Sequence, residues 1–174
     1  MNHYLGPAQI AAILLLMQRG LEELYSKRNT KNLLAKGGRE VGRDYYPVVA
    51  ITHLAWIASL FFLVPVITPI YWFFLTCFLL LQLARYWIIS TLGPFWTHRI
   101  ITLENAPLIT AGPYQFVRHP NYVVTILETA LLPMAFGAWA LSIIMTALWG
   151  SVLYYKIVLE NKALLERRDQ NDKA

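Results

Sequence analysis

Residues 70–92 read IYWFFLTCFLLLQLARYWIISTL, an apolar run in which Arg85 is the one charged residue. A run of this length and composition predicts a helix that crosses a lipid bilayer. The whole chain of 174 residues shares this character, because 57% of its residues are hydrophobic and 14% are charged. A typical soluble domain has about 25% charged residues. We therefore expect one domain, residues 1–174, that is an all-α polytopic membrane protein.

Further apolar segments surround this run, and each predicts another membrane-spanning helix. The expected helices, about five in all, cover Tyr4–Tyr25, Pro47–Val64, Ile70–Leu92, Asn121–Met134 and Trp139–Leu165. The N-terminus lacks a Lys/Arg-rich start and a small-x-small cleavage site, so we expect a retained first helix and not a signal peptide.

The basic residues are divided unevenly between the two ends of the expected bundle. They gather in residues 26–46, in the connection 93–120 and in the C-terminal tail, whereas the turns Pro65–Pro69 and Pro133–Ala138 carry no charge. The positive-inside rule then places the N-terminus outside and the C-terminus in the cytosol. Because these loops account for the net charge of +5, we do not expect binding to nucleic acid.

The cysteine and histidine content limits the chemistry of the chain. Cys77 is the single cysteine and lies within an apolar run. It excludes an internal disulfide and a zinc site built from several thiolates. The four histidines are scattered along the chain, so the sequence predicts no metal site.

Three ionisable residues fall inside the predicted spans at similar depths. At 1.5 Å of rise per residue, Arg85 lies about 12 Å, Glu128 about 10 Å and His53 about 9 Å from the cytosolic ends of their helices. Charged groups inside a membrane are costly and normally face a partner or a water-filled cavity. One interpretation is a structural Arg85–Glu128 pair between the third and fourth helices. The other is a catalytic role for the three residues.

The segment GPYQFVRHPNY, residues 112–122, places several polar groups beside a predicted span. Pro120 suits the first turn of a helix, because its missing N–H needs no partner there. The helix is therefore expected to begin near Pro120, with free backbone N–H groups that suit a carboxylate or a phosphate. Additional donors and aromatic faces come from Tyr114, Arg118, His119 and Tyr122. The segment predicts a cradle for an anionic, partly aromatic ligand.

The fourth predicted helix is short, since about 14 residues give roughly 21 Å against a hydrocarbon core of about 30 Å. Either the hairpin of the last two helices stops short of the far side, or the polar segment is set below the cytosolic surface and forms a pocket. In the fifth helix, Lys156 and Glu160 share one face, which by itself indicates a surface ion pair. Neither a Rossmann nor a P-loop nucleotide motif is present.

The segment GPYQFVRHPNY and the later segment KIVLENKALLE, residues 156–166, together resemble the isoprenylcysteine carboxyl methyltransferase family, above all its small bacterial members. The resemblance extends from about Arg85 to Leu165. It implies a membrane methyltransferase that uses S-adenosyl-L-methionine without a Rossmann fold. Residues 93–174 would then hold the cofactor-binding connection, the last two helices and the tail, with residues 1–92 forming the first three helices.

Matched position by position, the resemblance assigns most of the polar segment to the cofactor. With Arg118 added from the cradle described above, the candidate cofactor-binding residues are Ala106, Pro107, Leu108, Ile109, Tyr114, Arg118, His119, Pro120, Asn121, Tyr122 and Glu160. Lys156 occupies the position of a substrate-binding arginine in the family, and Asn161 that of a second glutamate. A lysine keeps the charge but lacks the fork that binds a carboxylate through two hydrogen bonds.

The candidate catalytic residues are Lys156, Glu128, His53 and Arg85. A carboxylate acceptor needs no base, whereas a phenol or an enol needs one, for which Glu128 or His53 is a candidate. We expect the polar cofactor to enter from the cytosol and a lipophilic or lipidated acceptor to enter from the surrounding membrane lipids. The resemblance suggests an isoprenylcysteine-like carboxylate or a polyketide lipid such as an alkylpyrone or a phenolic lipid, in a bacterial cytoplasmic membrane.

Two other functions are compatible with the sequence. Sterol reductases share a similar helix arrangement and an Arg-His-x-x-Tyr signal, and they use NADPH. The proline after His119 and the segment around Glu160 favour methyl transfer over reduction. A non-catalytic membrane protein with the same fold is the other alternative, and it predicts no cofactor binding.

Overall fold

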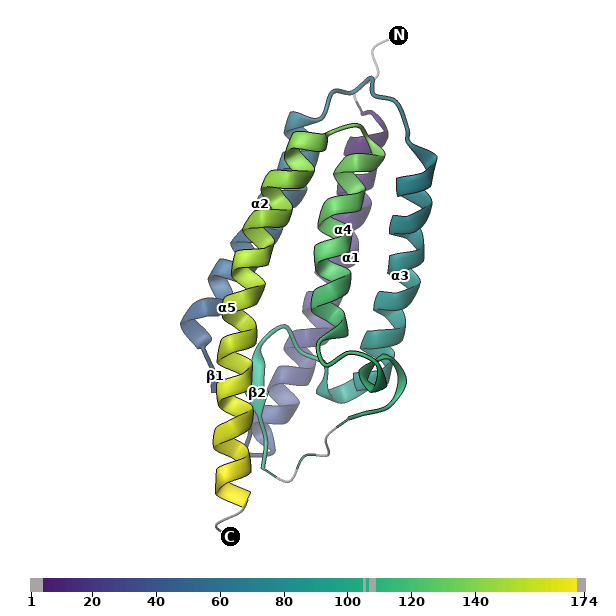
Figure 1. The fold of residues 1–174 in the computed structure, drawn as a ribbon. Helices are drawn as coiled ribbons and strands as arrows, with labels where there is room; N and C mark the ends of the chain where they lie inside the picture. Colours follow the sequence, from purple (N-terminus) through teal and green to yellow (C-terminus); the bar gives the residue numbers. More distant parts are fainter. Residues whose placement is uncertain (1–4, 105, 107–108, 172–174) are drawn as a thin grey trace.

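The computed structural model describes residues 5–104, 106 and 109–171, and for residues 163–171 it describes the backbone alone. Five long helices form an elongated bundle, with the two ends of the chain at opposite ends of the molecule (Figure 1). They are α1 (Pro7–Ala35), α2 (Tyr46–Leu63), α3 (Trp72–Leu92), α4 (Pro120–Ala135) and α5 (Trp139–Asn171). The expected all-α membrane architecture is confirmed.

Three helical segments in the described part of the chain are long and apolar enough to cross a membrane. They are Arg43–Leu63, Trp72–Phe95 and Trp139–Lys162. Many apolar side chains on these segments point outward, among them Phe62, Leu83 and Ile143, which are 78%, 68% and 68% exposed. Polar side chains such as Arg85 and Glu128 are buried instead. This reversal of the usual soluble pattern fits a bundle surrounded by lipid.

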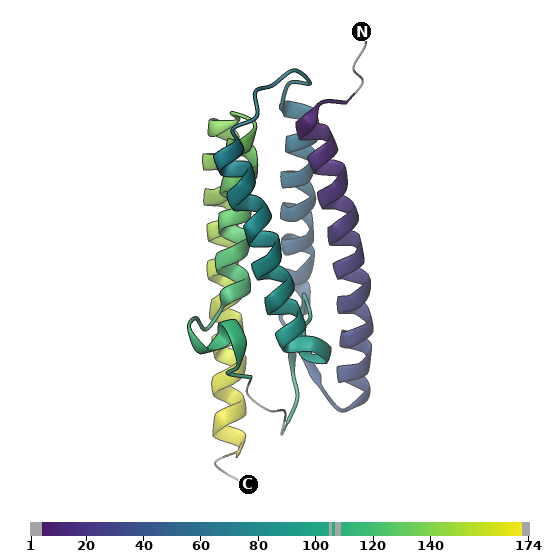
Figure 2. The same ribbon diagram turned by 90° about the vertical axis from the view of Figure 1, so that its right-hand side faces the viewer.

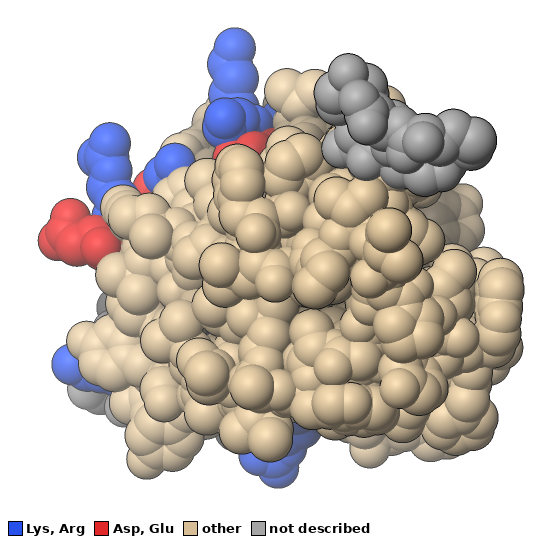
Figure 3. Space-filling model, turned by 90° about the horizontal axis from the view of Figure 1, so that it is seen from above, with Lys and Arg blue, Asp and Glu red and all other residues tan. Residues whose placement is uncertain are grey.

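The apolar core lies in the half of the bundle nearer the N-terminus. There Trp56 and Leu60 of α2 pack with Leu15 of α1 and Leu132 of α4. At this end the two uncharged turns bond to each other, because the Thr68 hydroxyl donates to the carbonyl of Phe136 at 2.7 Å. Viewed from this end, the described surface is almost free of charged side chains, which appear at its margin (Figure 3).

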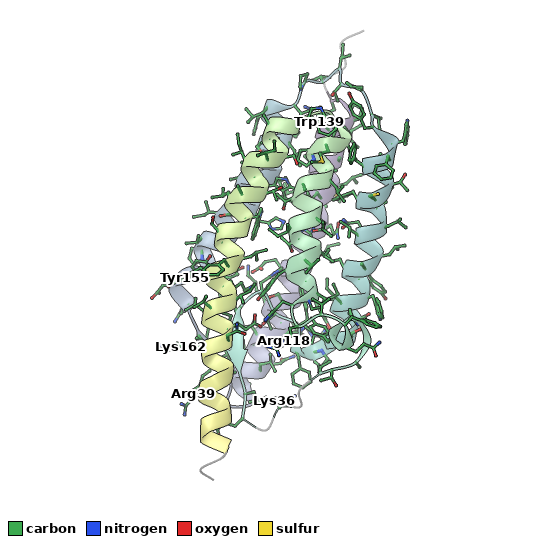
Figure 4. The ribbon with its side chains drawn as sticks, viewed as in Figure 1. Lys36, Arg39, Arg118, Trp139, Tyr155 and Lys162 are labelled. Carbon is green, nitrogen blue, oxygen red and sulfur yellow. The ribbon has the colours of Figure 1, made fainter. Side chains whose placement is uncertain are left out.

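The opposite end carries the polar connections. Residues 36–45 join α1 to α2, and residues 93–119 join α3 to α4. A two-stranded antiparallel ribbon ties these connections together, with β1 (Arg39–Val41) paired to β2 (Ile100–Thr102). The basic residues that Figure 4 labels lie in this half of the molecule, namely Lys36, Arg39, Arg118 and Lys162.

The helix boundaries differ from the sequence prediction mainly in α1. This helix continues to Ala35 instead of ending near Tyr25, and its predicted start at Tyr4 lies outside the described residues. The extra turns persist because their polar side chains bind the neighbouring connection. Asn29 donates to the carbonyl of Trp96 at 2.9 Å, and the Ser26 hydroxyl accepts the N–H of His98 at 2.8 Å.

The position of α4 in the bundle decides between the two arrangements that its short length allows. Its C-terminal end lies close to the start of α5, whereas its N-terminal end stops well inside the ends of α1 and α5 (Figures 1 and 2). The segment before Pro120 is therefore set back into the bundle, and a pocket forms there.

The orientation in the membrane remains a prediction, and cysteine labelling tests it. Ile67 in the α2–α3 turn is 89% exposed, and Lys36 at the opposite end is also exposed. In a Cys77→Ser background, a membrane-impermeant maleimide applied to intact cells should label Ile67→Cys. It should label Lys36→Cys only after the cells are permeabilised, because the positive-inside rule places the basic end in the cytosol. The reverse pattern would contradict the predicted orientation.

Candidate active site

A cavity of about 280 Å³ lies at the N-terminal end of α4. Its volume is close to the lower limit for small-molecule sites, which hold roughly 300–1,000 Å³. Its walls come from α1, the connection after α3, the start of α4 and the half of α5 nearer the C-terminus. The candidate residues that line it are Ala106, Ile109, Tyr114, Arg118, His119, Pro120, Asn121, Tyr122, Lys156 and Glu160. Pro107 and Leu108 lie outside the described residues.

Glu160 joins the two sequence segments at the centre of this cavity. Its Oε2 accepts a hydrogen bond of 2.7 Å from the Tyr122 hydroxyl and lies 3.4 Å from Nδ1 of His119. The rings of His119 and Tyr122 stack, with their centroids 5.3 Å apart and an angle of 11° between their planes. His119 has a non-helical backbone and precedes Pro120, where α4 begins. The start of α4 is therefore fastened to α5 through one carboxylate.

Lys156 is buried one turn before Glu160 on α5. Its ammonium donates to the carbonyl of His98 at 3.0 Å and lies 5.2 Å from the centre of the Tyr122 ring. The sequence alone indicated a surface ion pair with Glu160. The structure instead gives the two side chains separate partners, because α5 turns this face toward the connection and not toward solvent.

Two titratable groups of the α3–α4 connection, His98 and Tyr114, are held in their uncharged forms. Burial lowers the pKa of His98 to about 3, with further repulsion from Arg85 and Lys156. Burial also raises the pKa of the Tyr114 phenol, and the Glu160 carboxylate adds to this shift. At neutral pH these two side chains therefore add no charge to the region of the cavity.

Comparisons with known proteins identify the family of this chain. Residues 74–166, more than half of the chain, match the model of the isoprenylcysteine carboxyl methyltransferase (ICMT) family. A curated relative, the "Uncharacterized protein YpbQ" of Bacillus subtilis (strain 168), is 30% identical over 157 residues, which cover 88% of this chain and 94% of the relative. The chain belongs to the ICMT family. No solved structure matches it.

Membership of the ICMT family identifies a membrane methyltransferase. The matched region begins at Phe74, near the start of α3, and ends at Glu166 in α5. It therefore contains the whole α3–α4 connection and both segments that meet at Glu160. The helices α1 and α2 lie wholly outside the matched region.

Arg85 and Glu128 are brought together, but as members of a larger buried network. Their side chains approach to 3.6 Å. Arg85 forms a two-pronged pair with Glu22 of α1, with Nε at 2.8 Å and Nη2 at 2.7 Å from the carboxylate oxygens. Arg19 of α1 binds Glu128 at 2.6 Å and Glu22 at 2.8 Å. Two arginines and two glutamates thus neutralise one another inside the bundle.

The network lies beside the cavity and supports its wall. Arg85 also reaches Asn121 and Thr125 on α4, with Nη1 at 3.4 Å from an oxygen of each. Neither Arg85 nor Glu128 lines the cavity, so the geometry favours the structural interpretation of this pair. Sequence reasoning missed Arg19 and Glu22. Their signal was two opposite charges, three residues apart, within the first apolar helix.

His53 is separate from this cavity. Its ring packs edge-on against Trp56 and Trp149, with centroid distances of 5.5 Å and 5.2 Å. It belongs to a different hollow, between α1 and α2. The similar depth that the sequence predicted for His53, Arg85 and Glu128 therefore does not place them in one site.

Removing one member of the network should destabilise the protein strongly. In the variant Arg85→Met, two buried carboxylates share the single remaining guanidinium, a change that typically costs about 3–5 kcal/mol. Thermal unfolding of the detergent-solubilised protein should reveal a large loss of stability. The matched control is Lys27→Met, which removes an ion pair of 3.5 Å from a lysine that is 63% exposed. Equal stability of the two variants would contradict a structural role for the network.

Proposed function

We propose that this protein is an S-adenosyl-L-methionine-dependent O-methyltransferase that acts on a lipophilic acceptor. The observation that carries the proposal is the meeting of His119 and Tyr122 with Glu160 in one cavity. These residues belong to the two segments on which the resemblance to the ICMT family rests. Family membership supports the methyl-transfer class, and the cavity offers a place for its cofactor.

The residues of the cavity fit the chemical parts of this cofactor. The Glu160 carboxylate suits a cationic amino group. A carboxylate has about four acceptor positions, and Tyr122 and His119 both approach Oε2, which leaves acceptor positions for a bound ligand. The aromatic faces of Tyr114 and Tyr122 suit a flat base. Arg118 is exposed at the rim and suits a carboxylate. When bound, the cofactor would supply an electrophilic methyl group on a sulfonium.

Lys156 is the residue best placed to act on the acceptor. Its ammonium lies deeper than Glu160 on α5 and is held by the carbonyl of His98 and the ring of Tyr122. A buried cation there stabilises an acidic oxygen as an anion and draws it toward the cavity. Glu128 does not suit the role of base, because Arg19 and Gln82 already bind its carboxylate at 2.6 Å and 3.0 Å.

The polar end of the bundle supports a cytosolic active site in a bacterial cytoplasmic membrane. The cofactor is water-soluble and the cavity lies among the basic connections, which the positive-inside rule places in the cytosol. The acceptor is lipophilic and would arrive through the bilayer. Lys156 and Asn161, which differ from the family pattern, favour a polyketide-type lipid over an isoprenylcysteine carboxylate.

Cofactor binding gives the first test of this function. His119→Ala and Glu160→Ala each remove a partly buried polar contact worth about 1–3 kcal/mol, so each should weaken the affinity for S-adenosyl-L-homocysteine by roughly five- to 150-fold. Titration calorimetry on the purified protein measures this affinity, with Lys31→Ala as the control for loss of an exposed charge. Unchanged affinity in both site variants would remove the proposed site. Binding of NADPH instead would indicate a reductase, and binding of neither would indicate a non-catalytic protein.

Lys156 should affect methyl transfer without affecting cofactor affinity. Lys156→Met should lower transfer at least tenfold, about 1.4 kcal/mol in the barrier, because the oxyanion loses its counter-charge. Lys156→Arg should retain most activity with a carboxylate acceptor, which suits the arginine fork, and less with a single phenolate or enolate oxygen. The assay is transfer of a radiolabelled methyl group into an extracted lipid pool, with binding measured separately. A parallel loss of binding and activity in Lys156→Met would assign Lys156 to the cofactor.

A further inference from the structure

The α3–α4 connection presents two apolar side chains outward, directly before residues that line the cavity. Phe116 and Val117 are 75% and 43% exposed, and neither lines the cavity. They follow the short 3-10 helix η3 (Gly112–Gln115), which projects from one side of the bundle (Figure 2). We call residues 112–117 the η3 turn. Its outer face is apolar although the connection around it is polar.

The η3 turn packs against α3 within the part of that helix that is apolar enough to cross a membrane. A Cβ atom at Gly112 would lie 2.8 Å from the Thr91 hydroxyl oxygen and 3.3 Å from Nε1 of Trp87, so the backbone of the turn touches α3. Both α3 residues belong to the candidate span Trp72–Phe95. The next residue after the turn, Arg118, lies near the level of Lys162, where the α5 span ends (Figure 4). The turn therefore lies at the edge of the membrane and not beyond it.

The outer face of the turn continues a lipid-facing stripe of α3. Leu80, Leu83 and Trp87 are all exposed, and they are three or four positions apart, so they share one face of the helix. The next position on this face is Thr91, against which the turn packs. The two apolar side chains of the turn thus extend the surface that α3 presents to lipid. The stripe ends with a tryptophan, a residue that is typical of the boundary between membrane and water.

The backbone of the turn is suited to this place, because a backbone N–H in contact with lipid needs a partner within the protein. The N–H of Tyr114 donates to the carbonyl of Ala111 at 3.2 Å. The N–H groups of Phe116 and Val117 both donate to the carbonyl of Pro113, also at 3.2 Å, and a proline has no N–H of its own. The turn can therefore enter the lipid without leaving these donors unpaired.

We propose that the η3 turn is a membrane contact, in which Phe116 and Val117 insert among the lipids of the leaflet at the polar end of the bundle. Their partner is the boundary between the lipid headgroups and the acyl chains. Apolar and aromatic side chains bind non-spanning segments to a bilayer at this depth. The α3–α4 connection is then held by the bilayer as well as by α3.

The opposite face of the same turn belongs to the cavity. Tyr114 is partly buried and lines the cavity, and so do Arg118 and His119, which follow the turn directly. Insertion of the outer face holds these residues in position along the cavity wall. A polar outer face should lower the fraction of molecules whose cavity is ready to bind, and with it the apparent affinity. This coupling rests on the proposed function, whereas the membrane contact does not.

Fluorescence quenching tests the membrane contact without any cofactor. In a Cys77→Ser background, Phe116→Cys is labelled with nitrobenzoxadiazole, and the protein is reconstituted into vesicles of phosphatidylcholine and phosphatidylglycerol. Lipids that carry a nitroxide near the headgroup end of the chain should quench this label strongly, and aqueous iodide should quench it weakly. The matched controls are Leu83→Cys on the lipid-facing stripe and Lys36→Cys among the polar connections, which report contact with lipid and with water.

Two results would overturn the membrane contact. One is quenching of the label at Phe116→Cys by iodide to the extent seen at Lys36→Cys, which would place the turn in water. The other is a label that neither the lipid nitroxides nor iodide can reach, which would indicate a protein partner on the turn.

Cofactor affinity tests the coupling between the turn and the cavity. In calorimetry on the same vesicles, Phe116→Ser should weaken the affinity for S-adenosyl-L-homocysteine about threefold or more, because the turn loses its hold on the lipid. Phe116→Leu keeps an apolar side chain and should bind as wild type does. Leu83→Ser makes an equally polar change on α3 and should leave the affinity unchanged.

Wild-type affinity in Phe116→Ser, or equal losses in Phe116→Ser and Leu83→Ser, would overturn the coupling. If the wild-type protein binds no S-adenosyl-L-homocysteine, the proposed function fails, whereas the quenching experiment still decides the membrane contact.

Discussion

The buried network of Arg19, Glu22, Arg85 and Glu128 is the constraint on which the rest of the bundle depends. Charged groups inside an apolar bundle are tolerated when each has a partner of opposite charge and good geometry. Here the charges come from α1, α3 and α4, so the three helices must keep one relative register for all the hydrogen bonds of 2.6–2.9 Å to form. An apolar interface of the same size would allow these helices to slide or rotate more freely.

This register sets the position of the site. Arg85 reaches Asn121 and Thr125 near the start of α4, and Glu160 of α5 holds Tyr122 in the first turn of the same helix. The start of α4 is thereby fixed from two sides, well inside the polar end of the bundle. The setback leaves room for a cavity among the connections, and a separate hollow lies between α1 and α2.

Much of this arrangement could be predicted from the sequence because it depends on local properties. The apolar runs gave the five helices, and Pro120 gave the start of α4 to within one residue. The meeting of His119 and Glu160 followed from the resemblance to a family and not from spacing. Pairing across the bundle was harder to predict. One interpretation of the sequence pairs Arg85 with Glu128, and the two side chains do approach to 3.6 Å. The shortest bonds of Arg85 go to Glu22, since the choice among several carboxylates depends on helix rotation.

Other features were hidden because they depend on contacts distant in sequence. The three-residue strands β1 and β2 are too short to give a periodic pattern, and each exists only because the other lies beside it. The extension of α1 beyond Tyr25 is supported by Asn29, whose polar side chain alone favours a loop. In the sequence Lys156 resembles a surface residue, because its burial depends on the α3–α4 connection that packs against α5.

The proposed site of S-adenosyl-L-methionine is the cavity between the start of α4 and α5. It can be tested by ultraviolet crosslinking of the radiolabelled cofactor to the purified protein, followed by peptide mapping. Label is expected on the peptides that contain residues 112–122 and 156–162, and excess S-adenosyl-L-homocysteine should remove it. Label confined to other peptides, or label that the competitor does not displace, would rule out this cavity as the cofactor site.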